Sequence, residues 1–351
     1  MNRPVRVLVV DDSALARRII IDTISRDPRI EVVGSAPDVY AARDRILQLD
    51  PDVLTLDIEM PRMDGVEFLK RLMPKRPTPV VVVSALSRAG AAVTLDALAN
   101  GAVDFVLKPS TSFGQGLDAM ADELIGKILV AARTDVSRWR DARFRARAVA
   151  RSQTALAEST AKLIAIGAST GGTIALTAII QALPRTIPGV VVVQHMPPVF
   201  TAMFADKLNA ISSVEVAEAC DGARVLAGHV LVAPGGMHTT VERRGGHYVV
   251  RCRDGELVNG HRPSVDVLMH SVASAVGANA IGAILTGMGS DGAKGLLAMR
   301  EAGARTFAQD AATSVVFGMP QQAFKVGATE RLVPLVRIPD ELVRISREMT
   351  A

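Results

Sequence analysis

The first third of this chain contains four short apolar runs, and each leads directly into polar residues that can carry chemistry. The runs are rich in β-branched residues and cover residues 5–10, 53–56, 80–83 and 105–107. The polar residues that follow them are Asp11, Asp12, Asp57, Ser84 and Lys108. Such runs are typical of buried parallel strands, and ligand-binding groups gather beyond the carboxyl ends of these strands. The sequence therefore predicts that these polar side chains share one crevice.

The three carboxylates of this crevice predict a cation site. Negative groups placed so closely repel one another unless a hard cation lies among them, and carboxylate oxygens favour Mg²⁺. One carboxylate is then free to accept a phosphoryl group, while the metal and Lys108 neutralise the phosphate oxygens. We therefore interpret the cluster as a phosphorylation switch. The alternative is that the acids are loop residues and helix N-caps without chemistry.

The length and composition predict two globular domains. A chain of 351 residues with 49% hydrophobic and 22% charged residues can bury two cores of ordinary size. The sequence has no run of about 18 uncharged apolar residues, so we expect no membrane insertion and no signal peptide. Cys220 and Cys252 lack metal-ligand spacing. The simplest interpretation is a reduced, cytoplasmic protein, with one disulfide as an open alternative.

The positive charge of the chain is concentrated in one segment. The net charge is +4, and residues 133–151 contain seven arginines but only two acidic residues. The rest of the chain is close to neutral, so the basicity does not belong to a domain face that would bind nucleic acid. We interpret the segment as a solvated linker helix, with a docking site for an acidic partner as the alternative.

Two alternating patterns of strands and helices organise the chain. The first, from residue 5 to about 130, predicts a five-stranded, doubly wound α/β domain. The second starts at Lys162 and predicts a doubly wound α/β domain with a mainly parallel sheet and a β-hairpin insertion. Between them, a stretch rich in Ser, Thr and Ala indicates a linker. We therefore expect domains at 1–125 and 161–351, joined by a linker at 126–160 that contains the Arg-rich segment.

The order and spacing of the first polar cluster resemble the response-regulator receiver family over residues 1 to about 125. The matching blocks are Asp11-Asp12, the run DIEMPRMDG at 57–65, Ser84-Ala85 and Lys108-Pro109. The resemblance implies that Asp57 is the phosphoacceptor. It also implies that Mg²⁺ is held by Asp57, Asp12 and the backbone carbonyl of Glu59, with Asp11 acting through water.

The receiver resemblance further implies a set of switch residues. Ser84 and Lys108 would contact the phosphoryl group, and Phe105 stands where the family carries an aromatic switch residue. Relatives often carry Thr and Tyr in place of Ser84 and Phe105, which are conservative departures. For Phe105, a plain core aromatic is the alternative interpretation.

A glycine-rich turn in the second half of the chain predicts a nucleophilic serine. The segment GASTGG at 167–172 follows a predicted strand and precedes a helix. It fails as a dinucleotide fingerprint, because Ser169 occupies a position where only glycine lets the backbone approach a pyrophosphate. It matches G-x-S-x-G, whose strand–turn–helix context exposes a serine hydroxyl. The backbone amides from Thr170 onward would then be available to an oxyanion.

A serine nucleophile needs a base to remove its proton, and that base must itself be oriented. His195 and Asp291 each follow a predicted strand, as Ser169 does, so these three residues form a candidate triad. Taken alone, His195 fits a structural histidine equally well. The other histidines are placed less suitably; among them, we expect His238 and His261 in loops.

Motifs along nearly the whole chain resemble the CheB family, the chemotaxis protein-glutamate methylesterases that carry a receiver domain. Besides the blocks above, the motifs are QHMP at 194–197, APGG at 233–236, HRPSVD at 261–266 and LTGMGSDG at 285–292. The resemblance implies hydrolysis of γ-glutamyl methyl esters on chemoreceptors to carboxylate and methanol, and deamidation of certain receptor glutamines. It implies Ser169 as nucleophile, His195 as general base and acid, and Asp291 as its orienter.

The same resemblance implies partners and cofactors. Methyl-accepting chemoreceptors would be the substrates and a chemotaxis histidine kinase the phosphodonor, with Mg²⁺ needed for phosphorylation and no cofactor for ester hydrolysis. The main alternative is a transcriptional response regulator. Such a protein needs a recognition helix in a basic C-terminal domain, whereas residues after 160 are strand-rich, glycine-rich and roughly neutral.

Three residues keep two interpretations each. The backbone of Met288 can shape the oxyanion site, or its side chain can pack the loop. Arg262 and Asp266 can contact a receptor helix, or they can form a local ion pair.

Overall fold

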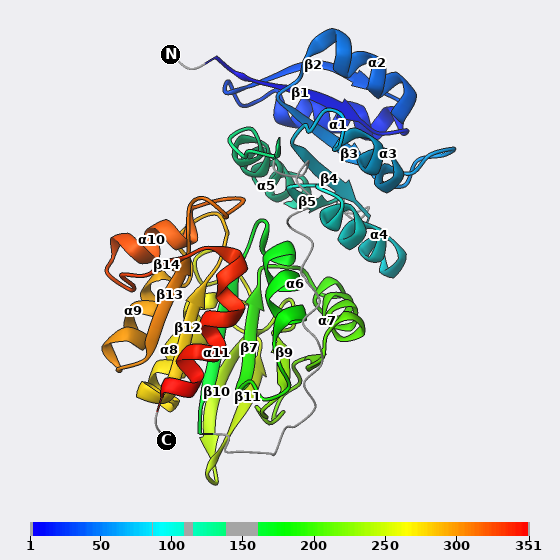
Figure 1. The fold of residues 1–351 in the computed structure, drawn as a ribbon. Helices are drawn as coiled ribbons and strands as arrows, with labels where there is room; N and C mark the ends of the chain where they lie inside the picture. The colour runs from blue at the N-terminus through cyan, green and yellow to red at the C-terminus, as the bar shows by residue number, and fades with distance from the viewer. Residues whose placement is uncertain (1–2, 86, 109–114, 138–160, 350–351) are drawn as a thin grey trace. The chain divides into compact units, whose positions relative to one another are not determined.

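The computed structural model describes residues 3–85, 87–108, 115–137 and 161–349. The chain divides into two compact units, Met1–Phe144 and Arg145–Ala351 (Figure 1). Most of the Arg-rich segment and the whole stretch 151–160 lie outside the described residues. The domain and linker bounds drawn from the sequence stay predictions.

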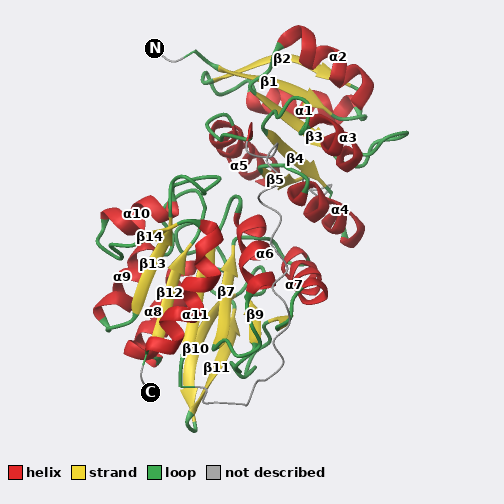
Figure 2. Ribbon diagram, viewed as in Figure 1, coloured by secondary structure: helices red, strands yellow, loops and turns green. Residues whose placement is uncertain are grey.

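The first unit is a parallel sheet with helices packed on it (Figure 2). Its strands, in spatial order, are β2 (Ile30–Ala36), β1 (Val5–Val10), β3 (Val53–Asp57), β4 (Val80–Ser84) and β5 (Asp104–Leu107). The helices are α1 (Ala14–Ile24), α2 (Val39–Leu49), α3 (Gly65–Leu72), α4 (Arg88–Ala99) and α5 (Gln115–Ala131). This order confirms the predicted five-stranded, doubly wound domain.

Local sequence explains why these elements begin and pack as they do. The β3 and β4 strands are buried at every position, as expected where helices cover both faces of a parallel sheet. The helices begin at residues whose side chains accept backbone N–H bonds, namely Ser13, Asp38, Asp64 and Ser87. These caps set the turns that follow the strands, and the turns carry the polar cluster.

The second unit is built on a seven-stranded sheet in which every pairing is parallel. In spatial order its strands are β14 (Leu332–Val333), β13 (Arg305–Gln309), β12 (Ala280–Ile284), β6 (Leu163–Ala168), β7 (Gly189–Gln194), β9 (His229–Val232) and β8 (Glu215–Glu218). A separate antiparallel hairpin consists of β10 (His238–Arg244) and β11 (His247–Arg253). The mainly parallel sheet with a hairpin insertion is therefore confirmed.

Helices connect the strands of this second sheet (Figure 2). The α-helices are α6 (Gly172–Ala182), α7 (Phe200–Ile211), α8 (Val265–Ala275), α9 (Ala293–Glu301), α10 (Met319–Lys325) and α11 (Ile338–Glu348). Two short 3-10 helices are η3 (Gly277–Asn279) and η4 (Leu335–Arg337). Within the described ranges, no helix is both long and apolar enough to cross a membrane.

The strand order brings three strand ends together. The β6 strand lies between β12 and β7, so the chain leaves β6 at a point where the order of strands reverses. Ligand sites in open α/β sheets form at such switch points. Ala168 pairs with Gln194, and Gly167 pairs with Ile284, so the loops after the three strands start at the same level.

One histidine lies in a different element from the one we expected. His238 begins β10 and pairs with Arg253, whereas the sequence suggested a loop. Its ring is buried, and Nε2 lies 2.7 Å from the carbonyl oxygen of Glu256. The hydrogen bonds of the hairpin ladder and this side-chain partner together hold His238 in an extended conformation.

Candidate functional site

Ser169 is the first residue after β6 and lies in a tight turn. Its backbone N–H donates to the carbonyl oxygen of Thr286, at 3.0 Å, and its carbonyl accepts from Gly172, at 2.7 Å. Between them Gly171 has a φ of 77°, and a Cβ there would lie 2.5 Å from Cβ of Val315. Only glycine fits both the left-handed backbone and the close contact. The turn therefore leaves the serine side chain half-buried at the edge of the sheet.

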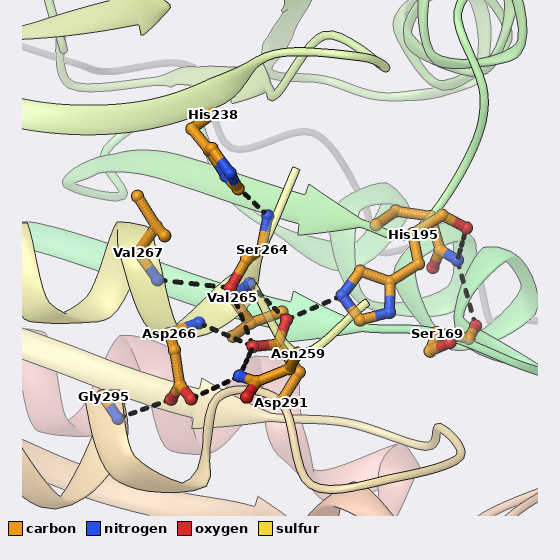
Figure 3. Close-up of polar contacts among 11 residues, drawn as sticks. Ser169, His195, His238, Asn259, Ser264, Val265, Asp266, Val267, Asp291 and Gly295 are labelled. Carbon is orange, nitrogen blue, oxygen red and sulfur yellow. Dashed lines mark hydrogen bonds and ion pairs between the residues drawn. The ribbon is translucent and has the colours of Figure 1, made fainter. Parts of the chain in front are cut away.

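His195 lies beside this turn because β7 ends next to β6. Its backbone N–H donates to the carbonyl oxygen of Ala168, at 3.1 Å. Its ring is 7% exposed, and Nε2 lies 2.9 Å from Oδ2 of Asp291. Figure 3 shows the ring between Asp291 and Ser169, with Nδ1 on the side of Ser169. Nδ1 is buried and has no hydrogen-bond partner among the described residues.

Asp291 is a buried carboxylate held by many donors. Its oxygens accept from His195 Nε2 (2.9 Å), Asn259 Nδ2 (2.7 Å), Ser264 Oγ (2.8 Å) and the backbone amides of Val265 (2.6 Å) and Asp266 (3.3 Å). Burial by itself raises the pKa of Asp291, but the bonds from His195 and Asn259 outweigh it and hold this pKa below its usual range. The carboxylate is therefore ionised at neutral pH. It stabilises a proton on Nε2 of His195 and leaves the Nδ1 lone pair directed toward Ser169.

The loop after β12 approaches Ser169 closely. A Cβ at Gly287 would lie 2.7 Å from Cβ of Ser169 and 2.3 Å from Sδ of Met319, so this position requires glycine. The next residue, Met288, has a side chain that is 41% exposed. This exposure does not favour a packing role for that side chain. The sequence predicts that the backbone amides that follow Ser169 are available to an oxyanion. Among these, the amide of Gly172 already donates to the carbonyl of Ser169 within the turn.

The polar cluster of the first unit forms a second site. Oxygens of Asp11, Asp12 and Asp57 lie within 4.8 Å of one another. Nζ of Lys108 lies 2.7 Å from Oδ2 of Asp57 and 2.9 Å from Oδ2 of Asp11. The amide of Glu59 donates to Oδ1 of Asp57, at 3.2 Å. A compact set of carboxylate oxygens fits a hard divalent cation such as Mg²⁺.

Charge and burial oppose each other at Asp57. Burial raises the pKa of Asp57, and the charge of Asp11 adds to this effect, while the hydrogen bond and charge of Lys108 lower it. The net pKa of Asp57 is above its usual value. Burial lowers the pKa of Lys108, but its bonds with Asp57 and Asp11 outweigh this effect and raise it. A carboxylate in this setting is stabilised by any added cation.

The remaining predicted switch residues, Ser84 and Phe105, are both buried in the receiver unit. Oγ of Ser84 is buried and lies 2.7 Å from Oγ1 of Thr94 on α4. The ring of Phe105 is also buried, with Nζ of Lys127 5.2 Å from its centroid. The same Nζ donates to the carbonyl of Phe105, at 2.6 Å. In this conformation Phe105 is a core aromatic, and its role as a switch stays a prediction.

Comparisons with known proteins assign the chain to a family. The CheB methylesterase family model matches residues 164–342, and the response regulator receiver domain model matches residues 7–115. The chain is 56% identical over 350 residues to the protein-glutamate methylesterase/protein-glutamine glutaminase of Syntrophotalea carbinolica, with 99% of each chain covered. It belongs to the CheB methylesterase family.

A second relative and a solved structure agree with this assignment. The protein of the same description from Sulfurimonas denitrificans is 52% identical over 353 residues, which covers 98% of this chain and 99% of that one. The crystal structure of the Thermotoga maritima CheB methylesterase catalytic domain is 38% identical, with a TM-score of 0.51. It covers 52% of this chain and 98% of that chain. The family and fold class predicted from the sequence are confirmed.

Two residues left open in the HRPSVD motif of this CheB-type domain have local partners. Arg262 forms an ion pair with Asp254 and also donates to the carbonyl of Gly255. Asp266 is buried and accepts from Nδ2 of Asn259, at 2.8 Å, and from the amide of Gly295, at 2.6 Å. These contacts favour a structural role for both residues, but the ion pair of Arg262 is with Asp254 and not, as the sequence suggested, with Asp266.

Sequence reasoning missed part of the support around Asp291. Ser264 is the N-cap of α8 and also donates to Asp291; a serine before an apolar helix could have predicted the cap, but not the bond to Asp291. Asn259 carried no sequence signal, because its side chain reaches Asp291 only through the turn that precedes α8. His261 stacks on His195, with ring centroids 3.7 Å apart.

Proposed function

We propose that Ser169, His195 and Asp291 hydrolyse γ-glutamyl methyl esters on chemoreceptors, and that phosphorylation of Asp57 controls this activity. Family membership supports methylesterase and glutaminase activity, since the relatives at 56% and 52% identity carry both names. One observation of the structure carries the residue assignment. A buried, ionised carboxylate is bonded to Nε2 of His195, while the free Nδ1 faces Ser169.

Acyl transfer follows from this arrangement. Nδ1 of His195 takes the proton of the Ser169 hydroxyl as Oγ attacks the ester carbonyl, and Asp291 stabilises the imidazolium that forms. The tetrahedral intermediate expels methoxide, which receives the proton from His195 and leaves as methanol. A water molecule then attacks the γ-glutamyl ester on Ser169, with His195 again as base, and releases the glutamate carboxylate. With a glutamine side chain, the same steps release ammonia.

The developing oxyanion needs hydrogen-bond donors near Ser169. We assign the backbone N–H of Met288 as one such donor, because the close approach of Gly287 places this loop directly against Ser169. The exposed side chain of Met288 leaves its backbone as the part that can serve the site.

The receiver unit supplies the control. Asp57 is the proposed phosphoacceptor, and Asp11, Asp12, Asp57 and the carbonyl of Glu59 would hold Mg²⁺, which neutralises phosphate charge during transfer. Lys108 already contacts Asp57, and Ser84 lies at the end of the neighbouring strand. The phosphodonor would be a chemotaxis histidine kinase and the substrates methyl-accepting chemoreceptors. Both partners imply a cytoplasmic location.

The decisive experiment measures methanol release from receptor membranes that carry methyl esters. We expect Ser169→Ala and His195→Ala to lower the rate by about 10⁴-fold or more, and Asp291→Ala to leave a larger residual rate. Deamidation should fall in parallel, because it needs the same acyl-enzyme. His270→Ala, on the exposed face of α8, is the control and should behave as the wild type. A Ser169→Ala protein that retains most of the activity would disprove the assignment.

A further inference from the structure

One segment of the chain contacts both members of the buried His195–Asp291 pair. Residues 258–264 lie between the β10–β11 hairpin and α8. A two-way backbone bridge between Val258 and His261, with N···O distances of 3.1 and 3.0 Å, closes a tight turn. Inside the turn, Asn259 has a φ of 53°. The turn thus directs two side chains, those of Asn259 and His261, toward the pair.

On the carboxylate side, Asn259 bonds with two buried acids. Its Nδ2 donates to Oδ1 of Asp291, at 2.7 Å, and to Oδ2 of Asp266, at 2.8 Å (Figure 3). Ser264 Oγ donates to the same Oδ1 of Asp291, at 2.8 Å. Because Oδ1 is occupied in this way, the other oxygen, Oδ2, is left to face Nε2 of His195. The backbone amides of Val265 and Asp266 also donate to this carboxylate, so loss of the Asn259 amide would loosen its alignment with His195 without releasing it.

On the imidazole side, His261 covers one face of His195. The ring centroids are 3.7 Å apart, and the ring planes differ by 15°. A flip of the His195 ring would exchange Nδ1 with Cδ2 and Nε2 with Cε1, which would remove the base from Ser169 and break the bond to Asp291. A parallel ring in van der Waals contact restricts tilting and flipping of this kind.

We propose that Asn259 and His261 are positioning residues for the hydrolysis, with Asn259 fixing the carboxylate of Asp291 and His261 fixing the plane of the His195 ring. The proposal rests on the proposed function, because it assumes that His195 is the base for Ser169. Neither residue takes part in proton transfer. Both act by keeping Nδ1 of His195 aimed at the serine hydroxyl.

The test for His261 compares His261→Ala with His261→Phe in the full-length protein. The first removes the stacked ring, while the second keeps a flat ring without ionisable nitrogens. We expect His261→Ala to lower kcat about 10- to 100-fold with little change in KM, as for a misplaced catalytic group. His261→Phe should recover most of the loss. If His261→Ala does not fold, His261→Leu replaces it, because it keeps bulk but not the flat ring. Wild-type kcat in the ring-less variant, or equal loss in His261→Phe, would overturn the proposal.

The test for Asn259 uses Asn259→Gly, because glycine accepts the left-handed backbone and the substitution removes the side chain that carries the amide. We expect kcat to fall about 10- to 100-fold, the usual effect of losing a hydrogen bond to a charged group. Nitrogen chemical shifts of His195 should show a proton on Nε2 in the wild type and a mixture of tautomers in Asn259→Gly. A purely structural role would not change that tautomer. Unchanged kcat with an unchanged tautomer would contradict the proposal.

Parallel controls separate failure of this inference from failure of the proposed function. His270→Ala removes an exposed histidine of α8 and should keep wild-type kcat. If Ser169→Ala retains activity, the proposed function itself is wrong. If Ser169→Ala is inactive while His261→Ala and Asn259→Gly keep wild-type kcat, the serine mechanism stands and only the positioning roles are wrong.

Discussion

Two buried aspartates belong to the proposed sites of this protein, and their surroundings shift their pKa values in opposite directions. Asp291 is surrounded by hydrogen-bond donors that outweigh the effect of burial, so its pKa is lowered. Asp57 shares one lysine with a neighbouring acid, and burial dominates, so its pKa is raised. The first carboxylate is stably ionised and can orient a base. The second is a carboxylate whose ionised form is destabilised by burial. A bound cation, or transfer of a phosphoryl group to it, relieves this destabilisation.

The raised pKa of Asp57 predicts the effect of Asp57→Asn on stability. A carboxyl whose folded pKa is raised contributes stability below its unfolded pKa, about 3.9, and this contribution is lost as pH rises through the folded pKa. At pH 7 the ionised group is therefore a cost that asparagine removes. With Mg²⁺ removed by a chelator, we expect the receiver transition of Asp57→Asn to have a higher melting temperature than that of the wild type. The gain should shrink toward pH 4 in calorimetric scans, and a lower melting temperature at pH 7 would contradict this account.

Gly287 predicts a steric effect at the nucleophile. In Gly287→Ala the new methyl group would lie 2.7 Å from Cβ of Ser169, so the serine or the loop must move. We expect methanol release to fall about 10²-fold, as for a displacement of about 1 Å at a catalytic group. Gly255→Ala is the matched control, because its Cβ would meet only the ring of His238, at 3.4 Å. Activity of Gly287→Ala near the wild-type level would show that the turn tolerates the shift.

At the scale of elements, parallel strands position the functional side chains, and a helix packed beside them contributes a side chain that bonds with one of these. The β6, β7 and β12 strands lie side by side in register, so the residues that follow them meet at one edge of the sheet. In the receiver unit, β3 and β4 end beside each other in the same way. Helix α4 then contributes Thr94, whose hydroxyl lies 2.7 Å from that of Ser84.

The contact between β4 and α4 predicts a restraint on the switch. Oγ1 of Thr94 donates to Oγ of Ser84, and we expect this bond to break when Ser84 turns toward a phosphoryl group on Asp57. Thr94→Val keeps the shape of the side chain but removes the bond, which is worth about 0.5–1.5 kcal/mol. We expect half-maximal activation at a phosphodonor concentration about 2- to 10-fold lower. Thr94→Ser retains a hydroxyl and should resemble the wild type; an equal shift in both variants, or in neither, would refute this restraint.

At the scale of the whole molecule, one unit has the chemistry of a switch and the other the chemistry of a serine hydrolase. The receiver has no chemical group to lend to ester hydrolysis, so we expect it to act by blocking or freeing the Ser169 site. A protein substrate needs that site open. Contacts of ordinary size between domains are only modestly stable, so a phosphate can shift such an equilibrium.

This organisation predicts that the unphosphorylated receiver restrains the esterase. A fragment that begins near residue 160 should demethylate receptors without phosphodonor about 5- to 150-fold faster than the unphosphorylated full-length protein. Asp57→Asn should fold, keep basal activity and ignore phosphodonor. The measurement is methanol release at equal protein concentration. A fragment no faster than the unphosphorylated full-length protein would rule out inhibition by the receiver.

Much of the fold and of both sites could be predicted from the sequence, because in parallel α/β domains the informative residues lie directly after the strands. Asp57 and Ser169 each follow or end a short apolar run, and the topology of such sheets places strand ends together. The family motifs then supplied the roles. Such short-range patterns can be recognised in the sequence without knowledge of the tertiary structure.

Only the tertiary structure decided how the catalytic pair is held. Asn259 and His261 reach Asp291 and His195 across 32 and 66 positions of sequence, respectively, through a turn whose place depends on the packing of the hairpin and α8. The opposite pKa shifts of Asp57 and Asp291 likewise depend on burial and on the number of donors around each carboxylate. Such effects arise from long-range packing, which no local pattern of residues encodes.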